Sequence, residues 1–339
     1  MNTRNTNSND QGVVIRKTVG SYEVRAGGRI LSCTLTSLLR KQLIYPIADP
    51  TSLRHVVMEV KSNEHFEPVV VGDEVRIVDL GGGSGQIIAV LPRRNRLARR
   101  SPVPMPSAHP FEQVIVANVD QVVPVFSAAA PPPKWNLLDR TLASAESLDL
   151  PALICITKMD LVQSGVNSKQ KELEAGLEEY RRIGYPLVLT SSISGEGIQA
   201  LERALAGRVS VLLGKSGVGK TTLLNAIQPG LGLRVKAVSQ ATGKGRHATT
   251  SVEMVPLEIG GSVVDTPGIR EFGLWDVEDD NLALFFREMR PLVGSCKFGL
   301  DCRHDAEPGC AIRKAVLAGE ISPRRYQSYL RLKEEIRFV

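Results

Sequence analysis

The sequence predicts a multidomain α/β protein with an N-terminal β-barrel, a central doubly wound domain built on a mostly parallel sheet, and a C-terminal helical domain. Short β-branched segments without a helical period fill the first part of the chain. Apolar runs then alternate with helix-like stretches, which indicates a parallel sheet covered on both faces. The predicted parts are a disordered tail at 1–11, the barrel at 12–91, a basic, proline-rich linker at 92–110, the central domain at 111–275 and the helical domain at 276–339.

The composition excludes several classes of protein. Of 339 residues, 42% are hydrophobic and 23% are charged, which excludes a largely disordered or collagen-like chain. Five cysteines are too few for a disulfide scaffold. The N-terminus lacks the apolar core of a signal peptide, and no apolar run reaches about 18 residues, so we expect a cytoplasmic protein that does not enter a membrane. The net charge of +6 suits a polyanionic partner.

The N-terminal barrel is predicted from candidate strands that are separated by glycine-containing turns. These candidates lie at 12–20, 21–26, 29–35, 55–60, 73–80 and 85–91. Five or six strands in roughly 80 residues is the size of an OB-fold, which is a small closed barrel.

The segment after the barrel carries a run of arginines followed by four prolines, which predicts a linker. The arginines are Arg93, Arg94, Arg96, Arg99 and Arg100. They are either solvated or in contact with nucleic acid.

Two helices are expected near the C-terminus. Asp276 is a candidate N-cap for an amphipathic helix. A last helix is expected to start at Ser322, with Pro323 in its first position. Its Tyr326, Tyr329 and Leu330 share a face that we expect to pack mostly in a core.

A phosphate-binding motif lies in the central domain. Residues 214–221 match G-x-x-x-x-G-K-[ST] between an apolar strand and a helix-forming segment, as the motif requires. Lys220 is expected to reach the β- and γ-phosphates, and the Thr221 hydroxyl is expected to bind Mg²⁺. The predicted nucleotide contacts are Gly214, Lys215, Ser216, Gly217, Val218, Gly219, Lys220, Thr221 and the adjoining Thr222.

Two other loops carry residue types that recognise guanine. The first matches [NT]-K-x-D with Thr157, Lys158, Met159 and Asp160. A buried Asp160 carboxylate would accept from N1–H and N2–H₂ of guanine, whereas adenine offers no such pair of donors. Ser191 and Ser192 end the next apolar strand, where a backbone N–H can bind guanine O6.

Two further elements are expected to hold Mg²⁺ and the γ-phosphate. Asp265 and Gly268 belong to a D-x-x-G element, in which the carboxylate holds Mg²⁺ and the glycine amide contacts the γ-phosphate. Before them lies the glycine-containing segment 243–250. Its Thr250, or else Thr249, is the candidate magnesium ligand, and the alternative is a plain surface threonine.

The order of these elements is unusual, because the guanine-reading loops precede the phosphate loop, whereas ordinary GTPases have the opposite order. Circular permutation of a doubly wound domain preserves the site. In this order the chain resembles the ribosome small-subunit-dependent GTPase family (RsgA, also called YjeQ or YloQ) from about residue 12 onward. The resemblance is carried by ANVDQV, TKMD, SSISGEG, GKSGVGKTTLLN, GKGRHATT, DTPGIREFGLW and CKFGLDCRHDAEPGCAI.

The resemblance implies an N-terminal OB barrel, a circularly permuted GTPase domain and a C-terminal zinc-binding domain. It also implies a role late in 30S subunit maturation, contacts with 16S rRNA near the decoding region, and GTP hydrolysis that the small subunit stimulates. The chain departs from the family pattern at Thr157, where Asn is commoner, at Ala248, and by one extra residue between the first two cysteines of the C-terminal cluster.

The catalytic water needs a residue to orient it. Many GTPases use a Gln directly after D-x-x-G, but this chain has Ile269, which can neither donate nor accept. We therefore expect slow intrinsic hydrolysis until a partner completes the site. His247 is the candidate, since its imidazole could accept from the water, and the resemblance also points to it. The alternative is a loop residue that faces rRNA or solvent.

The C-terminal cluster predicts one structural zinc ion. Three thiolates and one imidazole suit tetrahedral Zn²⁺ with no open position for water. The ligands would be Cys296, Cys302, His304 and Cys310. The alternatives are free cysteines packed in a core or a stray disulfide.

The predicted function is a GTPase that binds the immature 30S subunit and converts GTP to GDP and phosphate, with a monomer as the default state. Two other classes stay open. One is an RNA-binding module that holds GTP structurally with little turnover. The other is a P-loop kinase or ATPase that acts on a small molecule, which Asp160 argues against.

Overall fold

The computed structural model describes residues 9–18, 20–41, 46–48, 57–60, 68–100, 112–162, 168–231, 252–265, 274, 277 and 279–337. The chain forms two compact units. The first comprises Met1–Val119, His247–Pro256 and Ser262–Pro267, and the second comprises Asp120–Arg246, Leu257–Gly261 and Gly268–Val339. Among the described residues, no helix has the length and apolar character that a membrane crossing requires.

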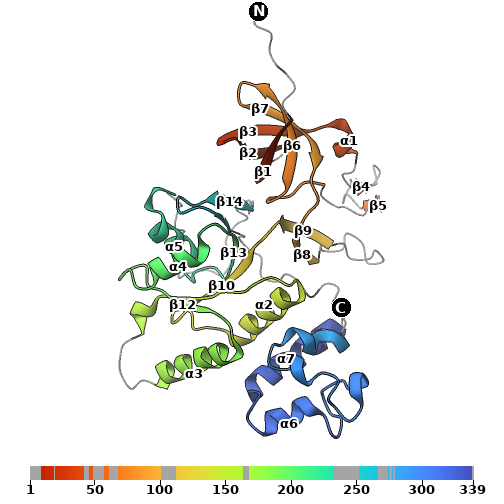
Figure 1. Ribbon diagram of the computed structural model, residues 1–339, viewed down its shortest axis with the longest axis vertical. Coiled ribbons are helices and arrows are strands. Elements are labelled where there is room, and N and C mark those ends of the chain that lie inside the picture. The colour runs from red at the N-terminus through yellow and green to blue at the C-terminus, as the bar shows by residue number, and fades with distance from the viewer. Residues whose placement is uncertain are drawn as a thin grey trace, which may run out of the picture. The chain divides into compact units, whose positions relative to one another are not determined.

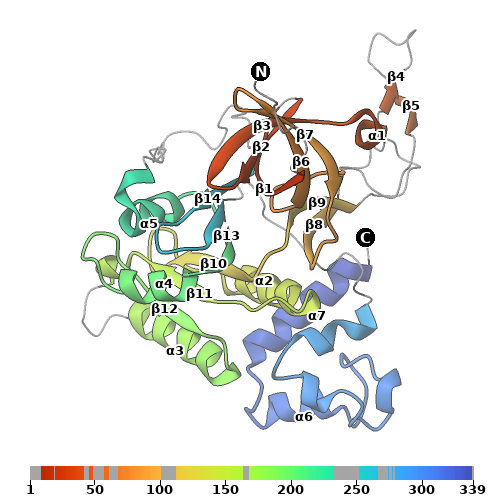
Figure 2. The same cartoon turned by 45° about the horizontal axis from the view of Figure 1, so that its top comes forward.

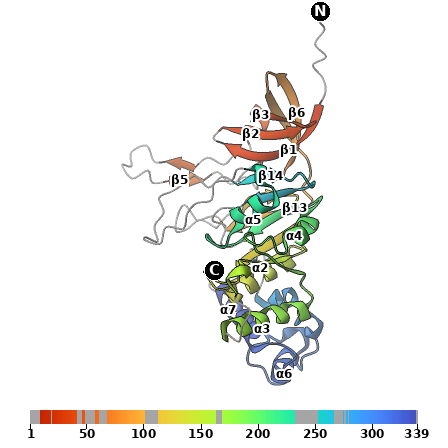
Figure 3. The same ribbon diagram turned by 90° about the vertical axis from the view of Figure 1, so that its left-hand side faces the viewer.

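A closed five-stranded barrel dominates the first unit (Figure 3). Its strands are β1 (Asn9–Thr18), β2 (Ser21–Ala26), β3 (Arg29–Leu35), β6 (Glu74–Gly81) and β7 (Ser84–Val90). Strand β1 pairs with both β2 and β6, which closes the barrel, and β3 runs parallel to β7. Alternate residues point inward, so Val14, Val24, Leu31, Ile77 and Ile87 form its core. The predicted barrel is confirmed.

The candidate strand at 55–60 is described only at β5 (Val57–Val60), which is not part of this barrel and pairs with β4 (Pro46–Ala48) in a separate two-stranded sheet. A closed barrel has no free edge to which a sixth strand could add. A four-residue helix, α1 (Ser37–Arg40), follows β3 and is capped by the Thr36 hydroxyl.

The predicted linker at 92–110 contains regular structure in its described part, residues 92–100. Strand β8 (Arg96–Arg100) pairs with β9 (Glu112–Ala117). The Arg93 guanidinium binds the buried Asp73 carboxylate at 2.7 Å, so this arginine is not a freely solvated side chain. A buried carboxylate requires such a partner, which composition alone does not reveal. The same unit contains β14 (Glu253–Pro256) and β15 (Ser262–Asp265), and β14 pairs with β1.

The second unit contains a four-stranded parallel sheet in the order β12-β11-β10-β13 (Figure 1). Its strands are β10 (Gln121–Ser127), β11 (Ile154–Thr157), β12 (Leu187–Leu189) and β13 (Val209–Leu213). The helices between and after them are α2 (Trp135–Ser147), α3 (Ser168–Ile183), α4 (Ile198–Leu205) and α5 (Lys220–Ile227), with 3₁₀ turns η1 (Met159–Leu161) and η2 (Pro229–Leu231). Right-handed connections place α2 and α3 on one face and α4 and α5 on the other, so the doubly wound prediction is confirmed (Figure 1).

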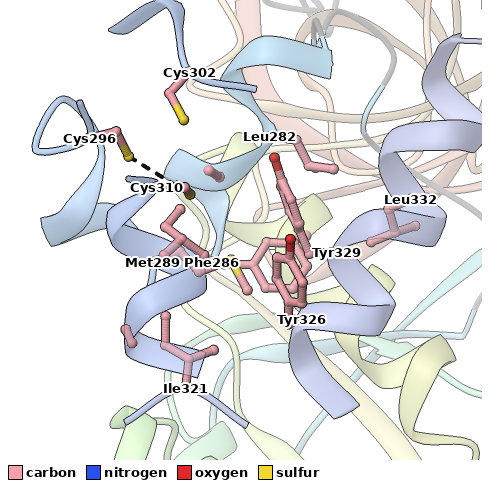
Figure 4. Packing of buried hydrophobic residues seen from close by; sticks show 14 residues of the cluster. Leu282, Phe286, Met289, Cys296, Cys302, Cys310, Ile321, Tyr326, Tyr329 and Leu332 are labelled. Atoms are coloured by element: carbon pink, nitrogen blue, oxygen red, sulfur yellow. Dashed lines mark hydrogen bonds between the residues drawn. The ribbon is translucent and has the colours of Figure 1, made fainter. Parts of the chain in front are cut away.

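The C-terminal helical part packs on α2 within the second unit (Figure 2). It contains the 3₁₀ turns η3 (Asp279–Phe285), η4 (Arg290–Leu292) and η5 (Gly299–Asp301), and the helices α6 (Ala311–Leu317) and α7 (Pro323–Arg337). Helix α7 begins at Pro323 as predicted, and its tyrosines lie in the core (Figure 4).

The prediction of an amphipathic α-helix after Asp276 is wrong, because the segment forms 3₁₀ structure instead. The described part is the 3₁₀ turn η3, followed by tight turns in which Phe286 N–H donates to the Ala283 carbonyl and Met289 N–H to that of Phe286. These bonds span three residues, as in a 3₁₀ helix, and they keep Leu282, Phe286 and Met289 in one core.

Candidate functional site

The phosphate loop joins β13 to α5, which begins at Lys220 (Figure 2). Gly219 immediately precedes the helix and has a φ of 98°, a left-handed conformation that favours glycine. A Cβ atom at Gly214 would lie 2.4 Å from the Val125 carbonyl oxygen. The path of the backbone therefore requires glycine at both ends of this loop.

The polar groups of the phosphate loop suit an anion. Within the described part of the chain, the backbone N–H groups of Ser216, Gly217 and Gly219 have no hydrogen-bond partner. The Lys220 ammonium donates to the Gly214 carbonyl at 2.6 Å, so it lies against the loop. Unpartnered N–H groups and an ammonium at a helix N-terminus are the donors that bind phosphate.

The base-reading loop after β11 is tied to the phosphate loop. Lys158 adopts a φ of 59°, and its ammonium donates to the Gly217 carbonyl at 2.7 Å and to the Ala130 carbonyl at 2.5 Å. The Thr157 Oγ1 lies 2.5 Å from the Val218 carbonyl oxygen. Although the sequence separates 157–160 from 214–221, the fold places the two loops side by side.

Ser191 links the second base-reading loop to the first. Its hydroxyl donates to Oδ1 of Asp160 at 2.6 Å and accepts from the N–H groups of Ile193 and Ser194, each at 3.2 Å. Of the amides at 191–196, that of Ser192 is the one without a partner among the residues that the structure describes. The loop thus presents one N–H donor near one carboxylate.

Asp160, which is expected to be buried when it reads the base, is exposed in this structure. It lies in the 3₁₀ turn η1, at the carboxyl end of β11, where a parallel sheet meets solvent. Met159 in the same turn is half-buried. A base that covers Asp160 would therefore have to supply the donors that replace water.

The remaining predicted nucleotide contacts fall in three places. Thr221 and Thr222 lie in the first turn of α5, and Asp265 is the last residue of β15, in the other compact unit. Hydroxyl and carboxylate oxygens are among the ligands that Mg²⁺ prefers. His247, Thr250 and Gly268 lie outside the described residues.

Comparison with known proteins decides the family. A family model described as RsgA GTPase matches residues 90–275. The chain belongs to the RsgA GTPase family. It is therefore a GTPase, as the sequence predicted. Its curated relatives include the small ribosomal subunit biogenesis GTPase RsgA of Gemmatimonas aurantiaca, which is 45% identical over 270 residues covering 79% of this chain and 84% of the relative. The protein of the same name from Pseudomonas aeruginosa is 43% identical over 261 residues, covering 77% and 74%.

Solved structures of RsgA relatives have the same fold. The crystal structure of YjeQ from Thermotoga maritima aligns with a TM-score of 0.72 at 31% identity, covering 96% of this chain and 98% of the other. YloQ, described as a circularly permuted GTPase, aligns with a TM-score of 0.68 at 30% identity and covers 99% and 98%. The predicted permuted order, with the base-reading loops before the phosphate loop, is confirmed.

The four cysteine and histidine side chains predicted as metal ligands come together in the C-terminal part of this RsgA-family chain. Figure 4 shows three of them, Cys296, Cys302 and Cys310. All four candidate ligand atoms lie within 4.8 Å of one another, and all four residues are buried. The Cys296 Sγ is 3.9 Å from the Cys310 Sγ and 3.4 Å from the His304 Nδ1. A tetrahedral ion with metal–sulfur bonds of about 2.3 Å separates its sulfur ligands by about 3.8 Å, so the cluster fits Zn²⁺.

Helix α7 supports the loop that carries His304, a role that was not predicted for its side chains. The Tyr326 hydroxyl donates to the His304 carbonyl at 2.8 Å, and the Tyr329 hydroxyl donates to the Arg303 carbonyl at 3.1 Å. The Lys333 ammonium also donates to the Arg303 carbonyl. The three side chains recur at three- and four-residue intervals on one helix face, a spacing that a helical pattern could have indicated.

Proposed function

We propose that this GTPase acts in the maturation of the small ribosomal subunit, with turnover that the subunit stimulates. The observation that carries the proposal is the hydrogen-bonded link between the base-reading and phosphate loops, made by Lys158 to Gly217 and by Thr157 to Val218. Such a link orders a guanine site and a phosphate site as one unit. The curated relatives are named as small ribosomal subunit biogenesis GTPases, which supplies the partner.

The hydrogen-bonding groups of each predicted residue indicate which part of the nucleotide it would contact. Asp160 accepts from N1–H and N2–H₂ of guanine, and the Ser192 N–H donates to O6. The phosphates lie on residues 214–222 at the N-terminus of α5. Mg²⁺, which neutralises charge on the phosphates, is held by Thr221, Thr250 and Asp265, and the Gly268 amide contacts the γ-phosphate.

His247 is proposed to orient the attacking water. The residue after the D-x-x-G element is Ile269, whose side chain has no hydrogen-bonding atom, so another group must accept from the water. An imidazole performs this task near neutral pH. Completion of the site by the subunit would explain stimulated turnover.

One Zn²⁺ ion is proposed to be held by Cys296, Cys302, His304 and Cys310. Four protein ligands leave no position for a substrate or water, so the ion would contribute folding energy and no chemistry. The buried cluster gives the C-terminal part a rigid core from which to contact 16S rRNA. We propose that the protein works in the cytoplasm as a monomer.

The test is GTP hydrolysis by the purified protein alone and with 30S subunits, 50S subunits or bare rRNA. We expect stimulation by 30S subunits alone. Tight GTP binding without stimulation by any of the three would instead support an RNA-binding module that holds GTP structurally. His247→Ala should lose the stimulated rate while keeping GTP affinity, and unchanged stimulation would remove His247 from catalysis.

A comparison of GTP and ATP binding distinguishes a GTPase from the remaining alternative, a P-loop kinase or ATPase. A GTPase with Asp160 in the base site should bind GTP far more tightly than ATP, because adenine leaves the carboxylate without a donor. Equal binding of the two nucleotides would favour a kinase or ATPase that acts on a small molecule.

A further inference from the structure

Four charged residues lie opposite one another across four neighbouring strands of the first unit. Arg16 of β1 pairs with Glu23 of β2 on one side and with Glu253 of β14 on the other. Glu253 in turn lies directly opposite Asp265 of β15. Directly opposed residues of antiparallel strands point to the same face of a sheet. We call Glu23, Arg16, Glu253 and Asp265, in that order, the charged row.

The barrel end of the charged row is closed by an ion pair. The Arg16 Nη1 lies 3.4 Å from the Glu23 Oε1, a contact that requires both side chains on one face of the sheet. All four residues of the row belong to the same compact unit, and all four are half-buried. The row therefore leads from the barrel strands to Asp265, the predicted magnesium ligand, across one continuous set of paired strands.

Two carboxylates, those of Glu253 and Asp265, are neighbours in the row. Opposed residues have Cβ atoms about 4.5–5.5 Å apart, and like charges at that spacing repel each other. A nearby cation offsets such repulsion. On the barrel side of Glu253 that cation is Arg16. On the other side it would be Mg²⁺ at Asp265, since carboxylate oxygens are ligands that suit this ion.

The spacing of the strands sets how strongly each charge acts on an ion at Asp265. Neighbouring strands are about 4.8 Å apart, so Glu253 lies about 5 Å and Arg16 about 10 Å from Asp265 across the sheet. By Coulomb's law in water, a unit charge about 7 Å from a divalent ion changes its affinity about three- to tenfold, and one at about 11 Å changes it about twofold when screening is weak. The two residues act with opposite signs, because one is an anion and the other a cation.

We propose that Glu253 is a positioning residue for Mg²⁺ at Asp265, and that Arg16 of the barrel opposes it. The Glu253 carboxylate attracts the ion to Asp265, whereas the Arg16 guanidinium reduces that attraction. The affinity for Mg²⁺ is thereby set partly by a charge on the barrel. This inference rests on the proposed magnesium ligand Asp265 and adds two residues that lie outside the nucleotide-binding motifs.

The test is the Mg²⁺ dependence of binding of the β,γ-imido analogue of GTP to the full-length protein, at an ionic strength of about 0.01 M, where the Debye length is about 30 Å. Glu253→Gln should raise the half-maximal Mg²⁺ concentration about three- to tenfold. Arg16→Gln should lower it about twofold, because an opposing charge is removed. Glu258→Gln is the matched control, since Glu258 is exposed after the end of β14 and outside the row, and it should stay within about 1.5-fold of the wild type.

The opposite signs separate an effect of charge from an effect on folding, because structural damage would move both variants in the same direction. With EDTA in place of Mg²⁺, Glu253→Gln should bind the analogue no less tightly than the wild type, since there is no ion to lose. At about 1 M salt, where the Debye length is about 3 Å, the shifts should largely disappear. Shifts of the same sign in Glu253→Gln and Arg16→Gln would overturn the proposal.

Asp265→Asn distinguishes failure of this inference from failure of the proposed magnesium site. If Asp265→Asn raises the Mg²⁺ requirement and Glu253→Gln does not, the magnesium site stands and the role of Glu253 is refuted. An unchanged Mg²⁺ requirement in Asp265→Asn would refute the magnesium site itself, and the inference with it.

Discussion

Arg325 of α7 and Asp139 of α2 form an ion pair of 2.7 Å in which the two side chains are only 1% and 0% exposed. The same Asp139 oxygen accepts from the Tyr180 hydroxyl at 2.5 Å, and its second oxygen accepts from Arg324 at 3.1 Å. Arg325 also binds Glu288 at 2.7 Å. One buried carboxylate thus joins helices α2, α3 and α7, and with them the GTPase region and the C-terminal part that carries the cysteine and histidine cluster.

The charges of this network are those of a formed ion pair. Burial opposes the charge on Arg325, but Asp139 and Glu288 outweigh that cost and raise the pKa of Arg325 well above its ordinary value. Burial and the neighbouring Asp139 also raise the pKa of Tyr180 well above its usual range, so this phenol remains a donor at neutral pH. Removing Arg325 would leave the two buried or nearly buried carboxylates of Asp139 and Glu288 without one of their cationic partners.

Arg325→Met should therefore lower the free energy of unfolding by about 3–5 kcal/mol, the usual cost of breaking a buried pair. Arg331→Met is the matched control, because Arg331 is exposed on the same helix. Urea denaturation of both variants provides the measurement. A change below about 1 kcal/mol for Arg325→Met would mean that the pair does not hold the two parts together.

Asp160→Asn should change the base preference from guanine to xanthine. The amide can donate to the 2-oxo group of xanthine but cannot accept both guanine donors, so GTP affinity should fall about a hundredfold or more, given two hydrogen bonds to a charged group of about 1.5–3 kcal/mol each. Affinity for xanthosine triphosphate should rise in return. Equilibrium binding of both nucleotides measures the exchange, and a variant that still prefers GTP would show that Asp160 does not read the base.

Cys302→Ser should remove the metal. The wild-type protein is expected to carry one zinc ion per chain, and a hydroxyl in place of a thiolate weakens a site of soft ligands. Cys33→Ser is the control, since Cys33 lies in the barrel core and is not part of the cluster. Metal analysis of the purified proteins provides the test. One zinc ion retained by Cys302→Ser would exclude the four-ligand assignment.

Glu307 should stabilise the metal-binding loop in a pH-dependent way. Burial would raise the pKa of Glu307, but hydrogen bonds from backbone N–H groups, including those of Arg303 at 2.8 Å and Asp305 at 3.2 Å, outweigh it and lower the pKa to about 2. A depressed carboxyl pKa contributes stability above the unfolded value near 4.5, and this contribution is lost as the pH falls from about 4.5 to about 2.

The variant Glu307→Gln should accordingly be less stable than the wild type at pH 7, and the difference should shrink as the pH falls below 4.5. Unfolding measured at several pH values in the same buffer series gives the two curves, with the exposed Glu334→Gln as control. A difference that is constant from pH 7 to pH 3 would contradict the ionised role of Glu307.

Local spacing explains what could be predicted. The phosphate loop, the TKMD element and the Cys-x5-Cys-x-His-x5-Cys cluster each lie within a short segment, where chain geometry already places the donors together. The period of apolar residues likewise indicates a barrel followed by a parallel sheet, because one face or both faces of a strand must be buried.

The features that could not be predicted depend on pairing between segments that are far apart in the chain. The strand β8 inside a segment of arginines and prolines depends on its partner β9, and the exclusion of 55–60 from the barrel depends on closure of β1 on β6.

The sequence by itself determined the family, the phosphate-loop motif and the Cys296, Cys302, His304 and Cys310 cluster, because these depend on residue types at fixed short distances. Only the tertiary structure decided that Thr157 gives its proton to Val218, that Asp160 is exposed and held by Ser191, and that Arg325 pairs with Asp139. Each of these contacts joins residues that are far apart in the chain. A hydrogen bond or ion pair of that kind exists only after the chain has packed and brought the two partners together, and no local sequence pattern indicates where that will happen.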